Sequence, residues 1–383
     1  MQQTRSTILR LAFIICTAFV LTPAQAQSRA DMEPVNDRPN PYLTVDDHFV
    51  MPIANMPRAG ERGRTWGSMP AMDTDIDGTS IWVIERCGAN SCIGSDVAAV
   101  HKFDALGKLV ESFGVGMFAW PHGIHIDQEG NVWVTDGRSA TPEELEQFPK
   151  ETNKGHTVFK FSPSGELLMT LGTPGMAGDP PQRLNEPCDV VIAPNGDILV
   201  AEGHSGQSED PGPTVVSRIS RFTSDGELIG VIGKLGSGPG EFKTPHAIEL
   251  DSTGRLIVAD RGNDRIQILD QAGDYIDEWH QFSRPSGIFI DANDMLYVAD
   301  GESSPDFRDG GLLPRPGERW RDWLRGIRIG SLQDGTVMFF IPEAEIAPEG
   351  VAVDAAGNVY GGEVLIGAYN GGKNQRLRKF VKR

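Results

Sequence analysis

Residues 121–136 read PHGIHIDQEGNVWVTD, and five further segments of the chain repeat this pattern. Each copy starts at a proline, continues through an apolar run, turns at Asp or Asn with a nearby glycine in most copies, and ends a second apolar run at an acid. The six copies start at Pro70, Pro121, Pro187, Pro245, Pro285 and Pro348. Two short apolar runs on either side of a D-x-x-G-N turn predict a β-hairpin in each copy.

A second hairpin pattern lies between the copies. It is clearest in HTVFKFSPSGELLMTLG (156–172), SRISRFTSDGELIGVIG (217–233) and DRIQILDQAGDYIDEWH (264–280), and it recurs over 96–114 and 326–342. Two hairpins per unit predict a four-stranded antiparallel blade, and six repeated blades predict a ring. The 45 glycines and 26 prolines of the chain also favour an all-β fold over a helical one. The sequence therefore predicts a six-bladed β-propeller.

The last copy indicates how the ring closes. After Glu363 the chain offers one outer strand, RLRKFVKR (376–383), without a partner in its own blade. YLTVDDHFVMP (42–52) has the alternation of the missing strand, so we expect it to pair with the C-terminal blade. This makes 42–383 a single domain. Residues 27–41, rich in Pro, Asn and Asp, are expected to form a flexible lead-in.

Residues 1–26 have the features of a signal peptide. Arg5 and Arg10 precede an apolar run over 11–21, and Ala24-Gln25-Ala26 provides a cleavage site near Ala26. The run is shorter than the ~20 residues that span a bilayer. We therefore expect an exported protein, periplasmic or secreted. Cleavage would change the net charge from −18 to −20, which argues against nucleic acid and anionic membrane as partners.

Three cysteines remain after the signal peptide. Cys87 and Cys92 are close enough in sequence to form a disulfide in an oxidising compartment, where it would fix the turn after Arg86. Cys188 is left over, and we expect a buried free thiol there.

The second position of each copy opens the innermost strand, which lines the central channel. These positions hold Ala71, His122, Cys188, His246, Ser286 and Glu349. His122, His246 and Glu349 come from alternate copies and should converge on the axis. Two imidazoles and a carboxylate form one of the ligand sets of catalytic zinc, so these three residues are predicted to hold a metal ion.

Two arginines follow the closing acid of a copy, where three of the six copies have glycine. They are Arg86 and Arg261, and both should lie at the mouth of the channel. A guanidinium donates two parallel hydrogen bonds to a carboxylate, which points to a small-molecule or peptide substrate that carries one. The alternative is a structural salt bridge to the adjacent acid, Glu85 or Asp260.

Four segments of the chain resemble the NHL-repeat propeller of the peptidyl-α-hydroxyglycine α-amidating lyases. They are WPHGIHIDQEGNVWVTD, EPCDVVIAPNGDILVAEG, GPGEFKTPHAIELD and VADRGNDRIQ. The resemblance covers the chain from about Pro70 to Glu363. It implies a zinc ion held by three histidines, arginines in the active site, and a catalytic tyrosine. It also implies cleavage of a peptidyl-α-hydroxyglycine to a peptide amide and glyoxylate. Apart from the resemblance, a structural Ca²⁺ is a further expectation.

The match is incomplete at two positions. His122 and His246 match two of the zinc ligands, and Arg86 and Arg261 match the arginines, but Glu349 stands where the third histidine is expected. His204, in Glu202-Gly203-His204, stands at the position of the tyrosine. An imidazole titrates near neutral pH, so His204 is predicted to replace the tyrosine as the general base.

Three function classes remain open. The first is a zinc-dependent lyase that releases glyoxylate or a related carbonyl product. The second is a metal-dependent hydrolase, such as a lactonase, on the same scaffold. The third is a non-enzymatic periplasmic propeller that binds a protein or a glycan, since a fold does not fix a function.

Overall fold

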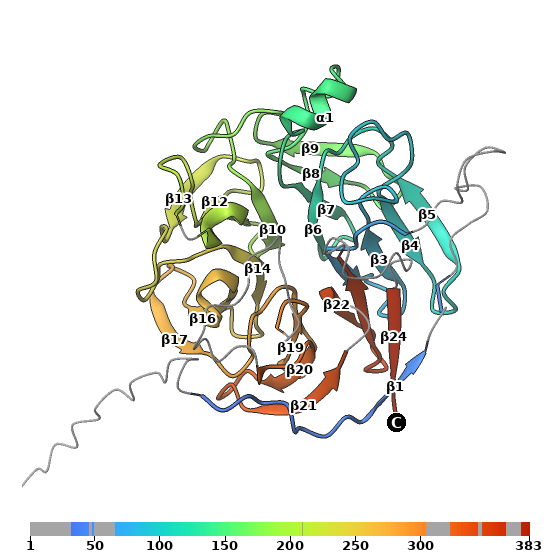
Figure 1. Ribbon diagram of the computed structural model, residues 1–383, viewed down its shortest axis with the longest axis vertical. Coiled ribbons are helices and arrows are strands. Elements are labelled where there is room, and N and C mark those ends of the chain that lie inside the picture. The colour runs from blue at the N-terminus through green and yellow to red at the C-terminus, as the bar shows by residue number, and fades with distance from the viewer. Residues whose placement is uncertain are drawn as a thin grey trace, which may run out of the picture.

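Six four-stranded antiparallel sheets stand around a central axis, each with its innermost strand toward that axis (Figure 1). This confirms the predicted all-β six-bladed propeller. The expected signal peptide lies outside the described residues. The computed structural model describes residues 32–45, 48–49, 66–208, 210–303, 322–343, 347–364 and 377–383.

Blades one to three follow the chain from the innermost strand outward. Blade one consists of β2 (Met72–Thr74), β3 (Ile81–Ile84), β4 (Val100–Phe103) and β5 (Leu109–Phe113). Blade two consists of β6 (Pro121–Ile126), β7 (Val132–Asp136), β8 (Thr157–Phe161) and β9 (Leu167–Leu171). Blade three consists of β10 (Pro187–Ile192), β11 (Ile198–Glu202), β12 (Arg218–Phe222) and β13 (Leu228–Ile232).

Blades four and five have the same order, and blade six combines both ends of the chain. Blade four consists of β14 (Pro245–Leu250), β15 (Leu256–Asp260), β16 (Arg265–Leu269) and β17 (Tyr275–Trp279). Blade five consists of β18 (Ile288–Ile290), β19 (Met295–Asp300), β20 (Gly326–Ser331) and β21 (Val337–Pro342). Blade six consists of β22 (Pro348–Val353), β23 (Val359–Glu363), β24 (Leu377–Lys382) and β1 (Tyr42–Val45).

The ring closes between the two ends of the chain, as predicted. Strand β1 pairs antiparallel with β24, with Tyr42 opposite Lys382 and Val45 opposite Lys379. An N-terminal strand thus completes the sheet that the C-terminal copy begins. In Figure 1 the blue β1 lies beside the red β24.

The segment just before β1 lies against the ring, while the flexibility expected over 27–41 stays a prediction. Its described part follows blade five, where the Val35 carbonyl accepts from Arg328 Nε at 3.2 Å and the Pro39 carbonyl accepts from the Phe340 amide at 3.2 Å. Arg38 Nε also donates to the Val337 carbonyl at 3.0 Å. The backbone of this segment is therefore held by hydrogen bonds to the ring.

The turn aspartate of the repeat organises its own hairpin. Asp127 Oδ1 accepts from the amides of Glu129 and Asn131, and its Oδ2 accepts from the indole of Trp133 in the next strand. The carboxylate thus satisfies turn amides and fixes the first large side chain of the second strand. Asp354 and Tyr360 repeat this arrangement in blade six.

Among the described residues an apolar layer lies between each pair of neighbouring blades, and a smaller cluster packs Ile93 against Ala119 and Trp120. The layer between blades two and three, for example, packs Trp133 against Val190 and Phe222. Helix α1 (Pro142–Gln147) lies in the connection between β7 and β8. Within the described part of the chain, no helix is long and apolar enough to cross a membrane.

Candidate metal and anion site

The second position of the repeat coincides with a β-bulge. The pairing register shifts between Pro121 and Ile124 in blade two and between Pro245 and Ala247 in blade four, around His122 and His246. The same shift occurs around Cys188 in blade three and Glu349 in blade six. A bulge re-aims the side chain that it carries, which explains why this position supplies the groups at the axis.

Each axial histidine is oriented by the next blade. His122 Nδ1 lies 2.8 Å from the Cys188 carbonyl, and His246 Nδ1 lies 3.1 Å from the Ser286 carbonyl. A carbonyl can only accept, so Nδ1 carries the proton in both rings and Nε2 keeps its lone pair. Both Nε2 atoms are buried and have no hydrogen-bond partner among the described residues. Two such lone pairs are suited to a metal ion.

His204 reaches the same point from a different element. It begins the short 3-10 helix η3 (His204–Gln207), directly after β11. Glu186 fixes this turn, because its carboxylate accepts from both the amide and the hydroxyl of Ser205 at 2.7 Å. Thr244 Oγ1 donates to the His204 carbonyl at 2.9 Å. The backbone of His204 is thus held from both sides.

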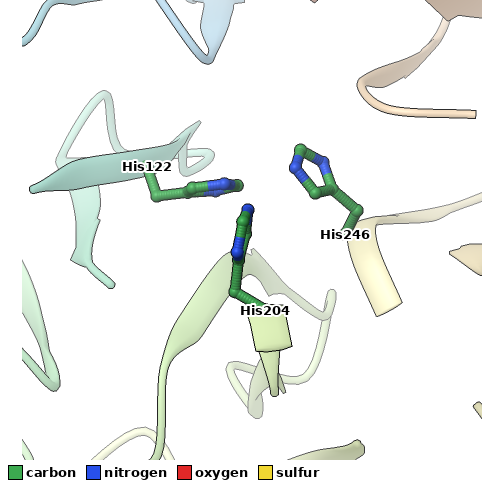
Figure 2. A group of neighbouring side chains, drawn as sticks. All are labelled: His122, His204 and His246. Carbon is green, nitrogen blue, oxygen red and sulfur yellow. The ribbon is translucent and has the colours of Figure 1, made fainter. Parts of the chain in front are cut away.

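Figure 2 shows the three imidazoles directed toward a common centre. One ring nitrogen from each of His122, His204 and His246 lies within 4.8 Å of the other two. Glu349 adjoins them, with Oε1 3.9 Å from His122 Nε2 and 3.7 Å from His246 Nε2. The structure therefore surrounds one small space with three imidazoles and a carboxylate.

Burial and neighbouring positive charge keep the three imidazoles neutral. Desolvation lowers the pKa of His122, His204 and His246 well below 6.5. For His204 the pKa is lowered further by nearby guanidinium groups, those of Arg261, Arg86, Arg138 and Arg284. Desolvation raises the pKa of Glu349, against the opposing effect of Arg261 and Arg86. Neutral imidazoles are the form that binds a metal.

Arg86 is buried beside this space. Its Nε donates to the Pro121 carbonyl at 3.2 Å, its Nη1 donates to Asn90 Oδ1 at 2.6 Å, and its Cζ lies 3.7 Å from the centre of the Trp120 ring. Its Nη2 is buried and has no hydrogen-bond partner within the described ranges. Burial lowers its pKa to about 9, so the group still carries its charge at neutral pH.

Arg261 lies on the other side of the imidazoles. It starts the 3-10 helix η4 (Arg261–Asn263), and its Nη2 donates to His204 Nε2 at 3.1 Å. Its Nη1 lies 3.5 Å from Glu302 Oε1 and 3.7 Å from Glu349 Oε2. Its Nε is buried and has no hydrogen-bond partner in the part of the chain that the structure describes. Both arginines thus keep a free N–H inside a buried site.

Neither arginine forms the salt bridge to its neighbour in sequence that was the structural alternative. Glu85 accepts from the amides of Gly67 and Gly88, and Asp260 pairs with Arg265. Among the interactions of the described residues, none joins Arg86 to Glu85 or Arg261 to Asp260.

The six residues expected at the site are thus neighbours in space. Sequence reasoning missed Trp120, whose ring centre lies 4.9 Å from those of both His122 and His204. It also missed Glu302, the acid beside Arg261. The signal for Trp120 was its place directly before the proline of the second copy.

The predicted states of the cysteines agree with the structure. Cys87 and Cys92 form a disulfide, and Cys188 is a buried free thiol. The Cys188 side chain lines a narrow cavity of about 30 Å³ in the channel, which His122, His246 and Asp189 also line. Among the described residues the three histidines are the group whose ligand atoms gather closely enough for a metal; a structural Ca²⁺ stays a prediction.

Comparison with known proteins identifies an NHL repeat at residues 242–269. The human NHL repeat-containing protein 3 is 34% identical over 188 residues, which cover 48% of this chain and 47% of that protein. A Caenorhabditis elegans protein named "Probable peptidyl-alpha-hydroxyglycine alpha-amidating lyase" is 32% identical over 164 residues, 42% of this chain and 39% of that one. The matched segments thus span half or less of these two relatives.

Among solved structures, a streptogramin B lyase aligns with a TM-score of 0.52 at 13% identity, over 89% of this chain and 98% of that one. At this identity the likeness shows the propeller fold alone.

Proposed function

We propose that this NHL-repeat β-propeller, whose relatives include amidating lyases, is a metal-dependent lyase that cleaves a carboxylate-bearing α-hydroxylated substrate of the peptidyl-α-hydroxyglycine type. The observation that supports it best is the three neutral imidazoles between two arginines that each keep a free, buried N–H. In such a reaction the hydroxyl loses its proton and the C–N bond breaks. The electron pair leaves with the amide nitrogen, which takes up a proton, and glyoxylate is released.

The substrate that fits is an anion, although the chain as a whole is strongly acidic. Four guanidinium groups, those of Arg261, Arg86, Arg138 and Arg284, act on the one imidazole of His204. Arg86 and Arg261 would donate their free N–H groups to the substrate carboxylate, in a site where burial strengthens charge-assisted hydrogen bonds. The Trp120 ring would provide an apolar wall against the rest of the substrate.

In this proposal His122, His204 and His246 hold zinc, and Glu349 moves the proton. Bound zinc would polarise a substrate oxygen as a Lewis acid. This reverses the sequence-based roles of His204 and Glu349, for a geometric reason. His204 supplies one of the three clustered ring nitrogens, and the surrounding positive charge disfavours protonation of this ring. Zinc bound through His204 Nε2 would take the place of the hydrogen bond from Arg261. Glu349 lies within 4 Å of both axial imidazoles and of Arg261.

The test is glyoxylate release from a short peptidyl-α-hydroxyglycine by the mature protein. We expect turnover that a chelator abolishes and zinc restores. Arg261→Ala should lower kcat/KM roughly 10- to 150-fold for the carboxylate substrate, and far less for its amide analogue, because a hydrogen bond between charged groups is lost. Arg261→Lys, which lacks the planar fork, should restore only part of the activity.

The same assay separates the other two function classes. Activity on a panel of lactones without glyoxylate release would favour the hydrolase. A fully metallated protein that turns over neither panel would favour a binding propeller; the human relative, for its part, is named for its repeat alone. We also propose that the mature protein acts outside the cytoplasm on a small molecule or peptide, without nucleic acid or membrane as a partner.

A further inference from the structure

The Arg86 guanidinium is held on three sides. Pro121 accepts from Nε, the Trp120 ring stacks at 3.7 Å from Cζ, and Asn90 Oδ1 accepts from Nη1 at 2.6 Å. Of these three contacts, Asn90 supplies the shortest hydrogen bond. It is also the one that does not come from the segment directly before His122. The remaining nitrogen, Nη2, is the one that keeps its N–H free.

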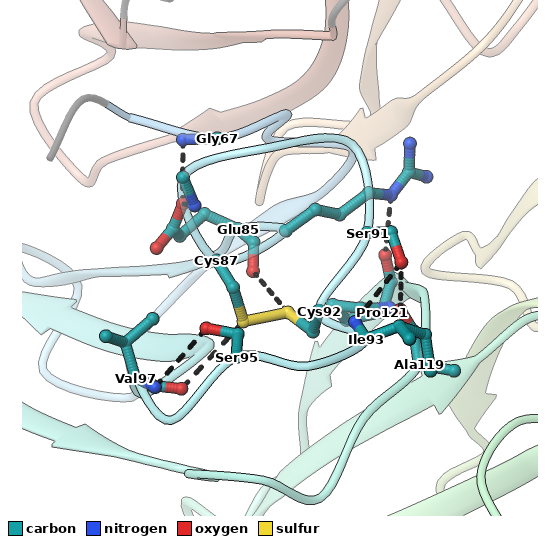
Figure 3. Close-up of a disulfide and its surroundings, with 12 residues drawn as sticks. Gly67, Glu85, Cys87, Ser91, Cys92, Ile93, Ser95, Val97, Ala119 and Pro121 are labelled. Atoms are coloured by element: carbon teal, nitrogen blue, oxygen red, sulfur yellow. Dashed lines mark hydrogen bonds between the residues drawn. A yellow bond between two sulfur atoms is a disulfide. The ribbon is translucent and has the colours of Figure 1, made fainter. Parts of the chain in front are cut away.

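Asn90 lies at the surface, in the loop that the Cys87–Cys92 disulfide closes. Figure 3 shows this disulfide and loop beside Ala119 and Pro121 of blade two. The end of the loop is fixed because the Cys92 amide donates to the Ala119 carbonyl at 2.8 Å. The Asn90 side chain is also fixed, since its Oδ1 accepts from Ser68 Oγ at 2.8 Å.

We propose that Asn90 is the positioning residue for Arg86, and that the disulfide loop holds Asn90 in place so that one edge of the guanidinium stays free for the substrate carboxylate. This deepens the proposed function and rests on it for the identity of the anion. A neutral amide suits this task because it accepts from the guanidinium without cancelling its charge. A carboxylate at the same place would accept equally well but would compete with an anionic substrate.

The loop provides three matched variants. Asn90→Ala removes the acceptor, and Asn90→Asp keeps both acceptor bonds but adds a negative charge. Ser91→Ala is the control, since the Ser91 hydroxyl donates to the Ala119 carbonyl in the same loop and has no hydrogen bond with Arg86. A fourth variant, Cys87→Ser/Cys92→Ser, opens the loop and is compared with wild type treated with a dithiol. In that reaction the dithiol gives two electrons and two protons to the disulfide, which becomes two thiols, and the dithiol becomes its own disulfide.

The probe is glyoxylate, titrated calorimetrically into the zinc-supplemented mature protein, so that binding is measured without turnover. We expect Asn90→Ala and Asn90→Asp each to bind glyoxylate about 10-fold more weakly than wild type, with Ser91→Ala unchanged. The opened or reduced loop should weaken binding in the same direction. With a turnover substrate the effect should appear in KM for the carboxylate and be absent for the amide analogue.

The Asn90→Ala variant decides between positioning and a structural role of the loop, because it removes the acceptor for Arg86 without adding charge. If Asn90 only shapes the loop, this variant binds glyoxylate as wild type does, or raises KM equally for the carboxylate substrate and its amide analogue, and either result overturns the proposal. Wild type that binds no glyoxylate also overturns it. Wild type that binds glyoxylate but releases none from the peptide substrate overturns the proposed lyase function and leaves the role of Asn90 standing.

Discussion

The groups at the axis come from two sources: the second position of the repeat supplies His122, His246 and Glu349, and the turn after β11 supplies His204. His122 and Cys188 occupy equivalent bulges in neighbouring blades, yet only His122 presents a free lone pair to the centre. The Cys188 carbonyl has a second task, since it accepts the Nδ1 proton of His122. The repeat thus provides both the ligands and the groups that orient them.

Metal content distinguishes the two assignments of the third ligand. If His204 completes the set, His122→Ala and His204→Ala should each weaken zinc binding by roughly 100-fold or more, while Glu349→Gln should weaken it less than about 10-fold. His280→Ala serves as the control, because that ring bonds to the Asp264 carbonyl and is not one of the clustered imidazoles. Elemental analysis after dialysis measures the result. Zinc lost in Glu349→Gln and kept in His204→Ala would restore the assignment made from sequence.

Zinc binding should depend weakly on pH near neutrality. Because the pKa values of the three imidazoles lie well below 6.5, these groups are already unprotonated there, and protons compete with zinc only at lower pH. Affinity measured by competition with a chelator should therefore be unchanged from pH 8 to pH 6.5 and fall below that range. A fall that is half complete near pH 6.5 would show that the site does not depress these pKa values.

The innermost strands approach one another closely near the axis, and glycine at the third position of some copies permits this. A Cβ at Gly123 would lie 2.5 Å from the Cys188 carbonyl oxygen and 2.7 Å from the Asp189 Cα. That carbonyl is the acceptor for His122, so the bulge of blade two and the backbone of blade three form one unit. A glycine here serves close packing rather than a turn.

We expect Gly123→Ala to destabilise the fold and to disturb the metal site together. Overpacking against a backbone typically costs about 1–3 kcal/mol, and the displaced carbonyl would no longer orient His122, which should weaken zinc binding ~10-fold or more. Gly230→Ala on the outer strand β13 is the matched control, since a Cβ there meets nothing within 4 Å. Thermal melting and zinc titration of both variants measure this. Equal zinc affinities of the two variants would show that close packing at Gly123 does not control the orientation of His122.

At the level of the whole ring, closure depends on the pairing of β1 with β24. Tyr42 of β1 is buried in the apolar layer between blades five and six, beside Phe380 of β24. The segment before β1 adds hydrogen bonds to blade five. The pairing thus covers the edge of the last sheet that β24 would otherwise expose.

Two truncations test this closure. A chain that starts at Pro34 should melt close to the mature protein, whereas a chain that starts at Asp46 should melt many degrees lower and aggregate on heating. The second truncation removes β1 and the segment before it, and so exposes the unpaired edge of β24. Scanning calorimetry with light scattering provides the measurement. The same melting temperature for both chains would contradict closure by β1.

The sequence by itself determined the blades, their number and the way the ring closes, because each hairpin is encoded locally by its turn and its apolar runs. It also predicted which residues meet at the axis, since equivalent positions of a repeat lie at equivalent places in a ring. Only the tertiary structure decided how those residues face one another. Three features depend on loops outside the repeat. They are the position of the His204 ring, the contacts of Arg261 with His204 and Glu349, and the hydrogen bond from Arg86 to Asn90. Those loops have no repeated pattern, and their shape is set by contacts between segments far apart in the chain.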